Sequence, residues 1–162
     1  MTPPRRALAV ILLLLTAAAC GDDSLLDDKA VPFSRDSLDG RRYALPQDSD
    51  GAVVMLHFWT GALPGHDGQL AALDELWRAR RSRGLLLLAV NVGQPREAVV
   101  AAIAGRTISY PVVLDPAAAL ARAYGVTTTP VTVLIDREGR VRMRVPGTIP
   151  FGALRSALET LL

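Results

Sequence analysis

Few side chains in this chain of 162 residues can serve as a nucleophile, a base or a metal ligand. The chain has a single cysteine, Cys20, and two histidines, His57 and His66. His57 lies inside an apolar run, and His66 ends the turn of the segment FWTGALPGHDGQLAAL, residues 58–73. An imidazole can act as a base near neutral pH or bind a metal. Two imidazoles without a thiolate fall short of the ligand number of common metal sites.

Each of these residues also has a purely structural interpretation. His57 is either a base close to the turn or a buried, hydrogen-bonded histidine of the core. His66 is expected to be neutral, because a positive charge is disfavoured at the N-terminus of a helix. Asp67 is expected to stabilise the first helical turn rather than to act as an acid.

The first nineteen residues are predicted to be a lipoprotein signal peptide. Arg5 and Arg6 precede a short apolar stretch, residues 7–15, and small residues then lead to Cys20. Cys20 in this position resembles the acylated cysteine of a bacterial lipobox; a plain signal peptide or an uncleaved anchor is the alternative. The predicted organisation is therefore a signal peptide over 1–19, a tether over 20–31 and a domain over 32–162.

Charge and cysteine content exclude some classes of function. The chain has 18 basic and 16 acidic residues, and removal of Arg5 and Arg6 leaves 16 of each. A balanced charge gives no reason to expect a nucleic-acid partner. A lone cysteine cannot form a disulfide within the chain, and no cofactor is expected.

Apolar runs and turn residues predict alternating strands and helices. A hairpin is expected over 33–45, because its two halves flank the turn of Asp39 and Gly40. The other expected strands are 53–59, 85–92, 110–114, 131–135 and 140–145, and the expected helices are 67–81, 96–104, 116–124 and 151–162. The cluster of arginines at 78–83 is expected to be the solvated end of a helix.

The order of DGRRYAL, VVMLHFWT, LLLLAVNV, YPVVLDPAAALARAYGV and TTTPVTVLIDREGRV resembles the membrane-anchored thioredoxins of the TlpA/ResA type. The similarity covers residues 31–162. It implies a thioredoxin-like α/β/α three-layer sandwich with a mixed central sheet. It also implies an N-terminal β-hairpin and a central helix-strand-helix insertion over 93–125.

The resemblance implies an active site that this chain cannot operate. The family places Trp-Cys-x-x-Cys at the start of the helix after the first core strand. Alignment on Phe58 and Trp59 puts Ala62 at the family's tryptophan, Leu63 at the first cysteine and His66 at the second. Neither Leu63 nor His66 can form or resolve a mixed disulfide, because that chemistry needs two thiols. No catalytic residue is therefore predicted, and Leu63 and His66 are vestigial redox positions.

The same resemblance implies a surface for a partner. Thr129 and Pro130 match the family's cis-proline loop, which lies against the active-site turn and binds extended peptide backbone. Trp59, Ala62, Leu63 and Pro64 would then form an apolar rim beside Pro130. Ordinary packing at a sharp loop and ordinary surface apolarity are the structural alternatives.

Together these observations predict a lipid-anchored, thioredoxin-like protein of the cell envelope, exposed to the periplasm or extracytoplasmic space. It is predicted to lack redox activity and to act as a binding or accessory module for an envelope protein or peptide. One alternative is a cysteine-independent or metal-handling activity at His57 and His66. Another is the thiol:disulfide oxidoreductase activity of the family, which would rest on fold alone.

Overall fold

The computed structural model describes residues 27–61, 66–148 and 150–162, without the side chains of His66 and Asp67. The predictions made for Cys20, Ala62, Leu63 and Pro64 therefore lie outside the described residues. Among the helices that are described, none is long and apolar enough to cross a membrane.

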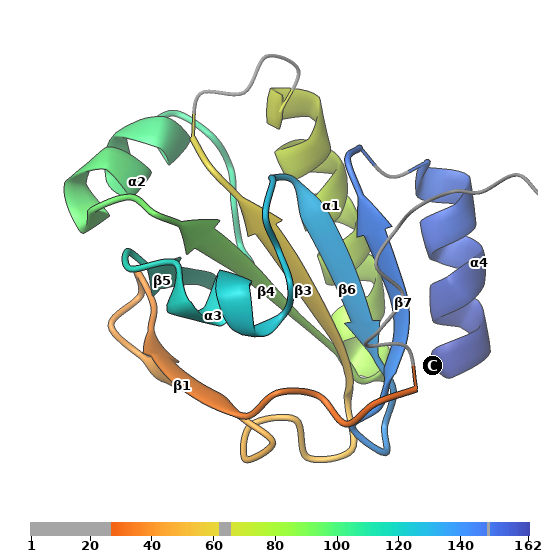
Figure 1. Ribbon diagram of the computed structural model, residues 1–162. Helices are drawn as coiled ribbons and strands as arrows, with labels where there is room; N and C mark the ends of the chain where they lie inside the picture. The colour runs from red at the N-terminus through yellow and green to blue at the C-terminus, as the bar shows by residue number, and fades with distance from the viewer. Residues whose placement is uncertain (1–26, 62–65, 149) are drawn as a thin grey trace, which may run out of the picture.

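A five-stranded mixed sheet forms the middle layer (Figure 1). Its strands, in spatial order, are β5 (Val112–Asp115), β4 (Leu85–Val92), β3 (Val53–Trp59), β6 (Val131–Ile135) and β7 (Val141–Pro146). β3 pairs in parallel with β4 and antiparallel with β6, so that it has a hydrogen-bonded neighbour on each edge. All seven residues of β3 are buried, as the continuous apolar run predicted for a strand covered on both faces.

Helices cover the two faces of the sheet unequally (Figure 1). The helical segments are α1 (His66–Arg80) with the short 3₁₀ helix η1 (Arg81–Arg83), α2 (Arg96–Ile103), α3 (Ala119–Ala123) and α4 (Phe151–Leu161). Leu70 and Leu73 of α1 and Leu154 of α4 pack with Met55 on one face. Leu120 of α3 packs with the opposite face. The predicted α/β/α sandwich with a mixed central sheet is confirmed.

The predicted N-terminal hairpin is also present. β1 (Phe33–Asp36) pairs antiparallel with β2 (Arg42–Leu45), and Phe33, Tyr43 and Leu45 complete the core on the α3 face. The Ser37 hydroxyl donates to the Val112 carbonyl, 2.8 Å away, and ties the hairpin to the edge strand β5. The predicted insertion is present as α2, β5 and α3 in order.

The helix predicted over 116–124 is shorter than expected. α3 begins at Ala119 because Ala118 has a left-handed backbone, with φ of 53°. The buried Asp115 carboxylate accepts hydrogen bonds from the Leu120 and Ala121 N–H groups, at 3.2 and 2.9 Å. This side chain satisfies N–H groups of the first turn that have no helical partner.

Residues 27–31 belong to the domain, which corrects the predicted end of the tether at Val31. The Asp27 N–H donates to the Val141 carbonyl and the Ala30 N–H to the Gly139 carbonyl, each over 2.8 Å. In return, the Val141 N–H donates to the Asp28 carbonyl over 2.9 Å. Backbone hydrogen bonds of this kind do not require particular side chains, so the polar sequence of the segment gave no sign of them.

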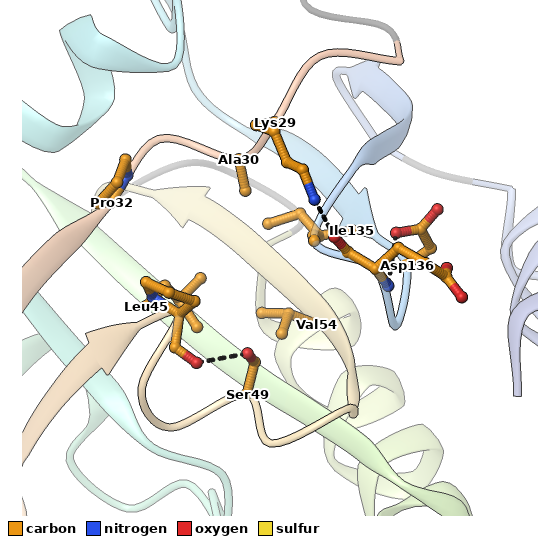
Figure 2. A pocket seen from close by; sticks show the side chains of 11 residues that line it. Lys29, Ala30, Pro32, Leu45, Ser49, Val54, Ile135 and Asp136 are labelled. Carbon is orange, nitrogen blue, oxygen red and sulfur yellow. Dashed lines mark hydrogen bonds between the residues drawn. The ribbon is translucent and has the colours of Figure 1, made fainter.

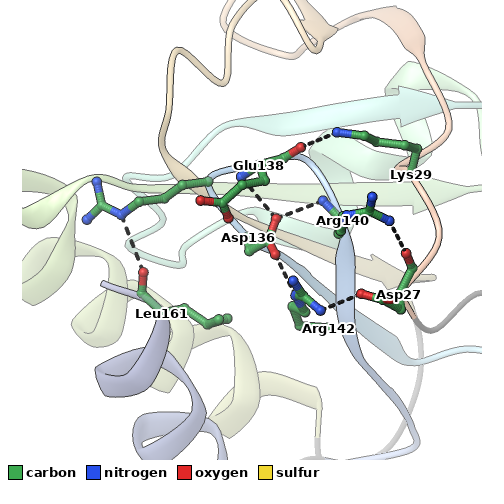
Figure 3. Close-up of polar contacts among 8 residues, drawn as sticks. Asp27, Lys29, Asp136, Glu138, Arg140, Arg142 and Leu161 are labelled. Carbon is green, nitrogen blue, oxygen red and sulfur yellow. Dashed lines mark hydrogen bonds and ion pairs between the residues drawn. The ribbon is translucent and has the colours of Figure 1, made fainter.

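Asp136, in the turn between β6 and β7, is the centre of the polar contacts that hold this segment (Figure 3). Its carboxylate accepts hydrogen bonds from the Glu138 and Arg140 backbone N–H groups and pairs with Arg142 at 2.5 Å. Arg142 also pairs with the Asp27 carboxylate at 2.5 Å, and the Arg140 guanidinium donates to the Asp27 carbonyl. Asp136 thus links the hairpin turn to the N-terminal segment.

The Asp136→Asn variant should unfold more easily than the native chain at pH 7. Burial acts to raise the pKa of Asp136, but the Arg140 backbone N–H and the Arg142 guanidinium outweigh it, so this pKa lies below its usual range. The stabilisation is therefore present above about pH 4, the ordinary carboxyl value, and disappears as the pH falls through the lower folded-state pKa. We expect a loss of about 1–3 kcal/mol at pH 7 and a smaller difference at pH 3, measured by urea unfolding. Asp50→Asn, at an exposed position, is the control; an equal loss there would contradict the assignment.

Candidate functional site

The predicted site lies where β3 ends and α1 begins. The structure places Trp59, the last residue of β3, in the core with Leu70 and Leu73 of α1, and its side chain is 1% exposed. The prediction that Trp59 lines an exposed apolar rim is therefore wrong. The strand explains this, because alternate residues of β3 face the α1 layer and Trp59 is one of them.

His57 is fully buried and lies two residues before Trp59 in β3, so the two side chains point to the same face of the sheet. Its Nδ1 lies 2.8 Å from the Thr132 hydroxyl, and the two residues are direct neighbours in the pairing of β3 with β6. This geometry agrees with the hydrogen-bonded core histidine considered from the sequence. A fully buried imidazole cannot reach a ligand in solution unless the packing around it opens, so a role as a base would require such an opening.

The loop before β6 approaches the end of β3. The peptide bond between Thr129 and Pro130 is cis, as the family resemblance implied. The Thr129 hydroxyl lies 3.1 Å from the Thr60 hydroxyl, immediately after β3, and Thr129 and Pro130 are both half-exposed. A second cis bond, between Leu45 and Pro46, was not predicted. The structure thus brings Thr129 and Pro130 to the end of β3, next to Thr60, with their surfaces partly accessible.

Two residues of this site were missed in the sequence. The side-chain oxygen Oε1 of Gln94 accepts a hydrogen bond of 2.6 Å from the Gly61 N–H and one of 3.0 Å from the side-chain amide of the buried Asn91. Gln94 therefore connects the end of β4 to the first residues of the turn. Asn91 stands out as a polar residue in the apolar run LLLLAVNV, whereas Gln94 lies in a loop without periodicity and gave no signal.

Gly61 is a close-packing position. A Cβ added there would lie 2.5 Å from the Ala102 Cβ of α2, well inside van der Waals contact. No larger residue fits unless α2 moves. Gly61 therefore sets how closely the inserted helix α2 approaches the turn.

The described part of the site offers anchoring groups rather than reactive ones. No group of three or more histidine, cysteine, aspartate or glutamate side chains suited to a metal occurs among the described residues. A mostly apolar cavity of about 250 Å³ lies between Ala30, Leu45, Val54 and Ile135 (Figure 2). Val54 and Ile135 pair at the end of β3 remote from the turn, so this cavity is separate from the predicted site.

Comparison with known families agrees with this arrangement. The pattern of the AhpC/TSA family matches residues 26–144. The chain belongs to the AhpC/TSA family. Within this family the predicted resemblance to the TlpA/ResA type is confirmed, since thiol-disulfide oxidoreductases of that type match most of the chain.

Three relatives of this AhpC/TSA protein show how far the similarity extends. It is 31% identical over 132 residues to the thiol-disulfide oxidoreductase ResA of Geobacillus thermodenitrificans, covering 82% of this chain and 75% of that protein. It is 31% identical over 130 residues to ResA of Bacillus subtilis, covering 80% and 72%. Among solved structures, the exposed lipoprotein thioredoxin Etrx1 of Streptococcus pneumoniae superposes with a TM-score of 0.73 at 26% identity, covering 81% of this chain and 100% of that one.

Gly61→Ala should destabilise this AhpC/TSA domain through its contact with α2. Overpacking of this kind costs about 1–3 kcal/mol. Ala102→Gly removes the opposing methyl group and alone costs about 1 kcal/mol of helix propensity. We expect the double variant to lose less free energy of unfolding than the sum of the two single losses, as measured by chemical unfolding. Strict additivity would show that the two positions are not in contact.

Proposed function

We propose that this chain is a lipid-anchored, thioredoxin-like protein of the cell envelope that does not exchange disulfides and serves as a binding or accessory module. The observation that carries the proposal is the single cysteine, Cys20, in a chain that otherwise keeps the thioredoxin-like architecture. Dithiol exchange requires an attacking thiolate and a resolving thiol. Cys20 lies thirty-nine residues before Trp59 in a predicted signal sequence and supplies neither at the turn.

The architecture around the turn supports a binding role. Thr129 and Pro130 lie half-exposed beside the end of β3, held there by the contact between Thr129 and Thr60. Gln94 fixes the Gly61 N–H from the opposite side. A loop that is held in place presents its backbone to a partner with little loss of entropy.

The envelope location rests on the sequence and on one relative. The signal-like N-terminus with Cys20 supports export and acylation. A structurally similar protein, Etrx1, is described as an exposed lipoprotein thioredoxin. Lipidation is tested by mass spectrometry of the membrane-extracted protein, in which an acylated N-terminal Cys20 is the supporting result. A mature chain that begins elsewhere would contradict the anchor.

Absence of redox activity is tested by insulin reduction with dithiothreitol, using the detergent-solubilised full chain. We expect no rate above the uncatalysed background, because no thiol pair is available at the turn. The double variant Leu63→Cys with His66→Cys is the positive control, since it restores the family's Cys-x-x-Cys spacing. Catalysis by the native chain would disprove the proposal. A variant that gains activity would show in addition that the scaffold still supports the chemistry.

The binding role is tested by a photo-crosslinking residue placed at Leu63 in the native envelope. We expect a discrete adduct from this position, because it borders Pro130 in the predicted arrangement. The control probe replaces Arg155, an exposed residue of α4 that forms no ion pair with the described carboxylates. Adducts of equal pattern at both positions, or none at Leu63, would contradict docking at the turn.

Metal handling by His57 and His66 is the alternative function. Against it stand the burial of His57 and the occupation of its Nδ1 by the Thr132 hydroxyl. We expect His66→Ala, and His57→Ala with His66→Ala, to leave the stoichiometry of Zn²⁺ and Cu²⁺ binding unchanged in calorimetric titrations. Loss of one equivalent in both variants, with circular dichroism unchanged, would favour the alternative instead.

A further inference from the structure

A second surface of the molecule has the features of a binding site and lies away from the turn. It is a groove of about 440 Å³ between the C-terminal half of α1, the end of α2 and the β1–β2 hairpin. Its lining includes five half-buried apolar side chains and two buried tyrosines: Leu38, Trp77, Ile103, Ile108 and Pro111, with Tyr43 and Tyr110. A groove of this size and character suits an apolar or aromatic group.

Two arginines are stacked on aromatic rings of this groove. The Arg41 guanidinium lies 4.9 Å from the centre of the Tyr43 ring, and the Arg81 guanidinium lies 5.0 Å from that of Trp77. Such cation–π contacts fix the direction of a flexible side chain without neutralising its charge. Arg41 lines the groove itself, and Arg81 lies beside it over the Trp77 ring; both arginines are exposed to solvent.

Neither stacked arginine forms an ion pair with any carboxylate in the part of the chain that the structure describes. Asp39 also lines the groove next to Arg41 and interacts with its charge, although the two side chains form no ion pair. Its carboxylate accepts hydrogen bonds from the Arg41 backbone N–H and the Tyr43 hydroxyl. Two guanidinium groups without an ion pair thus lie in or next to the groove, with the single negative charge of Asp39 beside one of them.

The walls of the groove are fixed by hydrogen bonds from separate elements. The Arg96 guanidinium donates to the Leu38 carbonyl at 2.8 Å, and the Leu38 N–H donates to the Val112 carbonyl at 2.9 Å. On the other side the buried Asp74 carboxylate accepts from the Ser109 N–H and hydroxyl, each at 2.6 Å. A groove fixed in this way loses little entropy when it binds a partner.

We propose that this groove binds an acidic peptide segment of a partner protein, with an apolar or aromatic side chain between Trp77 and Tyr43 and carboxylates paired with Arg41 and Arg81. The class of ligand follows from the charge and chemistry of the groove. Apolar walls select the body of the ligand, and unpaired guanidinium groups select flanking carboxylates, which they bind in a planar, bidentate manner. This inference is independent of the binding role proposed for the turn, because no residue is shared between the two surfaces.

The test uses the peptide acetyl-Glu-Leu-Phe-Glu-amide and the detergent-solubilised full chain. The chain has two tryptophans. Trp59 is buried in the core and Trp77 lines the groove, so a change in fluorescence when the peptide is added is assigned to Trp77. We expect saturable binding with Kd on the order of 1 mM or tighter, a range typical of short peptides with few anchors. Binding should weaken as salt rises from about 20 to 500 mM, because exposed charges are screened.

Matched variants and peptides separate the proposal from non-specific association. Arg41→Gln and Arg81→Gln should each weaken binding about two- to fivefold, and Arg155→Gln should leave it unchanged. The peptide with both Glu replaced by Gln should bind more weakly than the acidic one, and the Lys version least of all. Equal affinity for the three peptides, insensitivity to both arginine variants or no saturation would overturn the proposal. Weaker peptide binding in a Thr129→Ala variant, with unchanged binding in both arginine variants, would assign the peptide to the turn instead.

Discussion

Every layer of this protein depends on the burial of β3 on both faces. Its odd-numbered residues contact α1 and α4, and its even-numbered residues contact α3 and the N-terminal hairpin. A strand in this position must be apolar throughout, and a polar residue within it must find a partner inside the protein. His57 meets that requirement with the Thr132 hydroxyl on β6. Packing therefore accounts for the hydrogen bond of the His57 imidazole before any function is assigned to it.

Apolar periodicity was sufficient to predict most strands and helices, because long buried strands and amphipathic helices leave a strong pattern in the sequence. Their arrangement as a thioredoxin-like sandwich followed from the family resemblance. Periodicity failed where backbone or single side chains decide the structure. The start of α3 depends on the Asp115 carboxylate and on the left-handed Ala118. The docking of Asp27 depends on backbone pairing. Trp59 is buried because its place in β3 decides its exposure, whereas the apolar rim was predicted from its neighbours in the turn.

The candidate site also combines features that could be predicted from the sequence with features that could not. The cis bond before Pro130 followed from the family resemblance, which carries information about loops that periodicity lacks. Gln94 could not be predicted, because a lone glutamine in a loop has the same sequence appearance whether it faces solvent or holds a strand end. Its contact matters because it fixes the turn from the side of β4, as Thr129 does from the side of β6. Thr60 and Gly61, which lead into the turn, are therefore held by residues other than the two that would do redox chemistry.

The attachment of Asp27 to the β6–β7 hairpin has a mechanical consequence. Val141 pairs with Ile135, and Ile135 with Val54, so the first described residues meet the sheet at the end opposite the turn. A pulling force or a torque that arrives through the N-terminal side of the chain reaches the fold at this hairpin. Backbone hydrogen bonds and the paired charges of Asp27 and Arg142 share that load before the rest of the sheet carries it. The candidate site lies at the other end of β3, so such a load crosses the length of the sheet before it reaches the site.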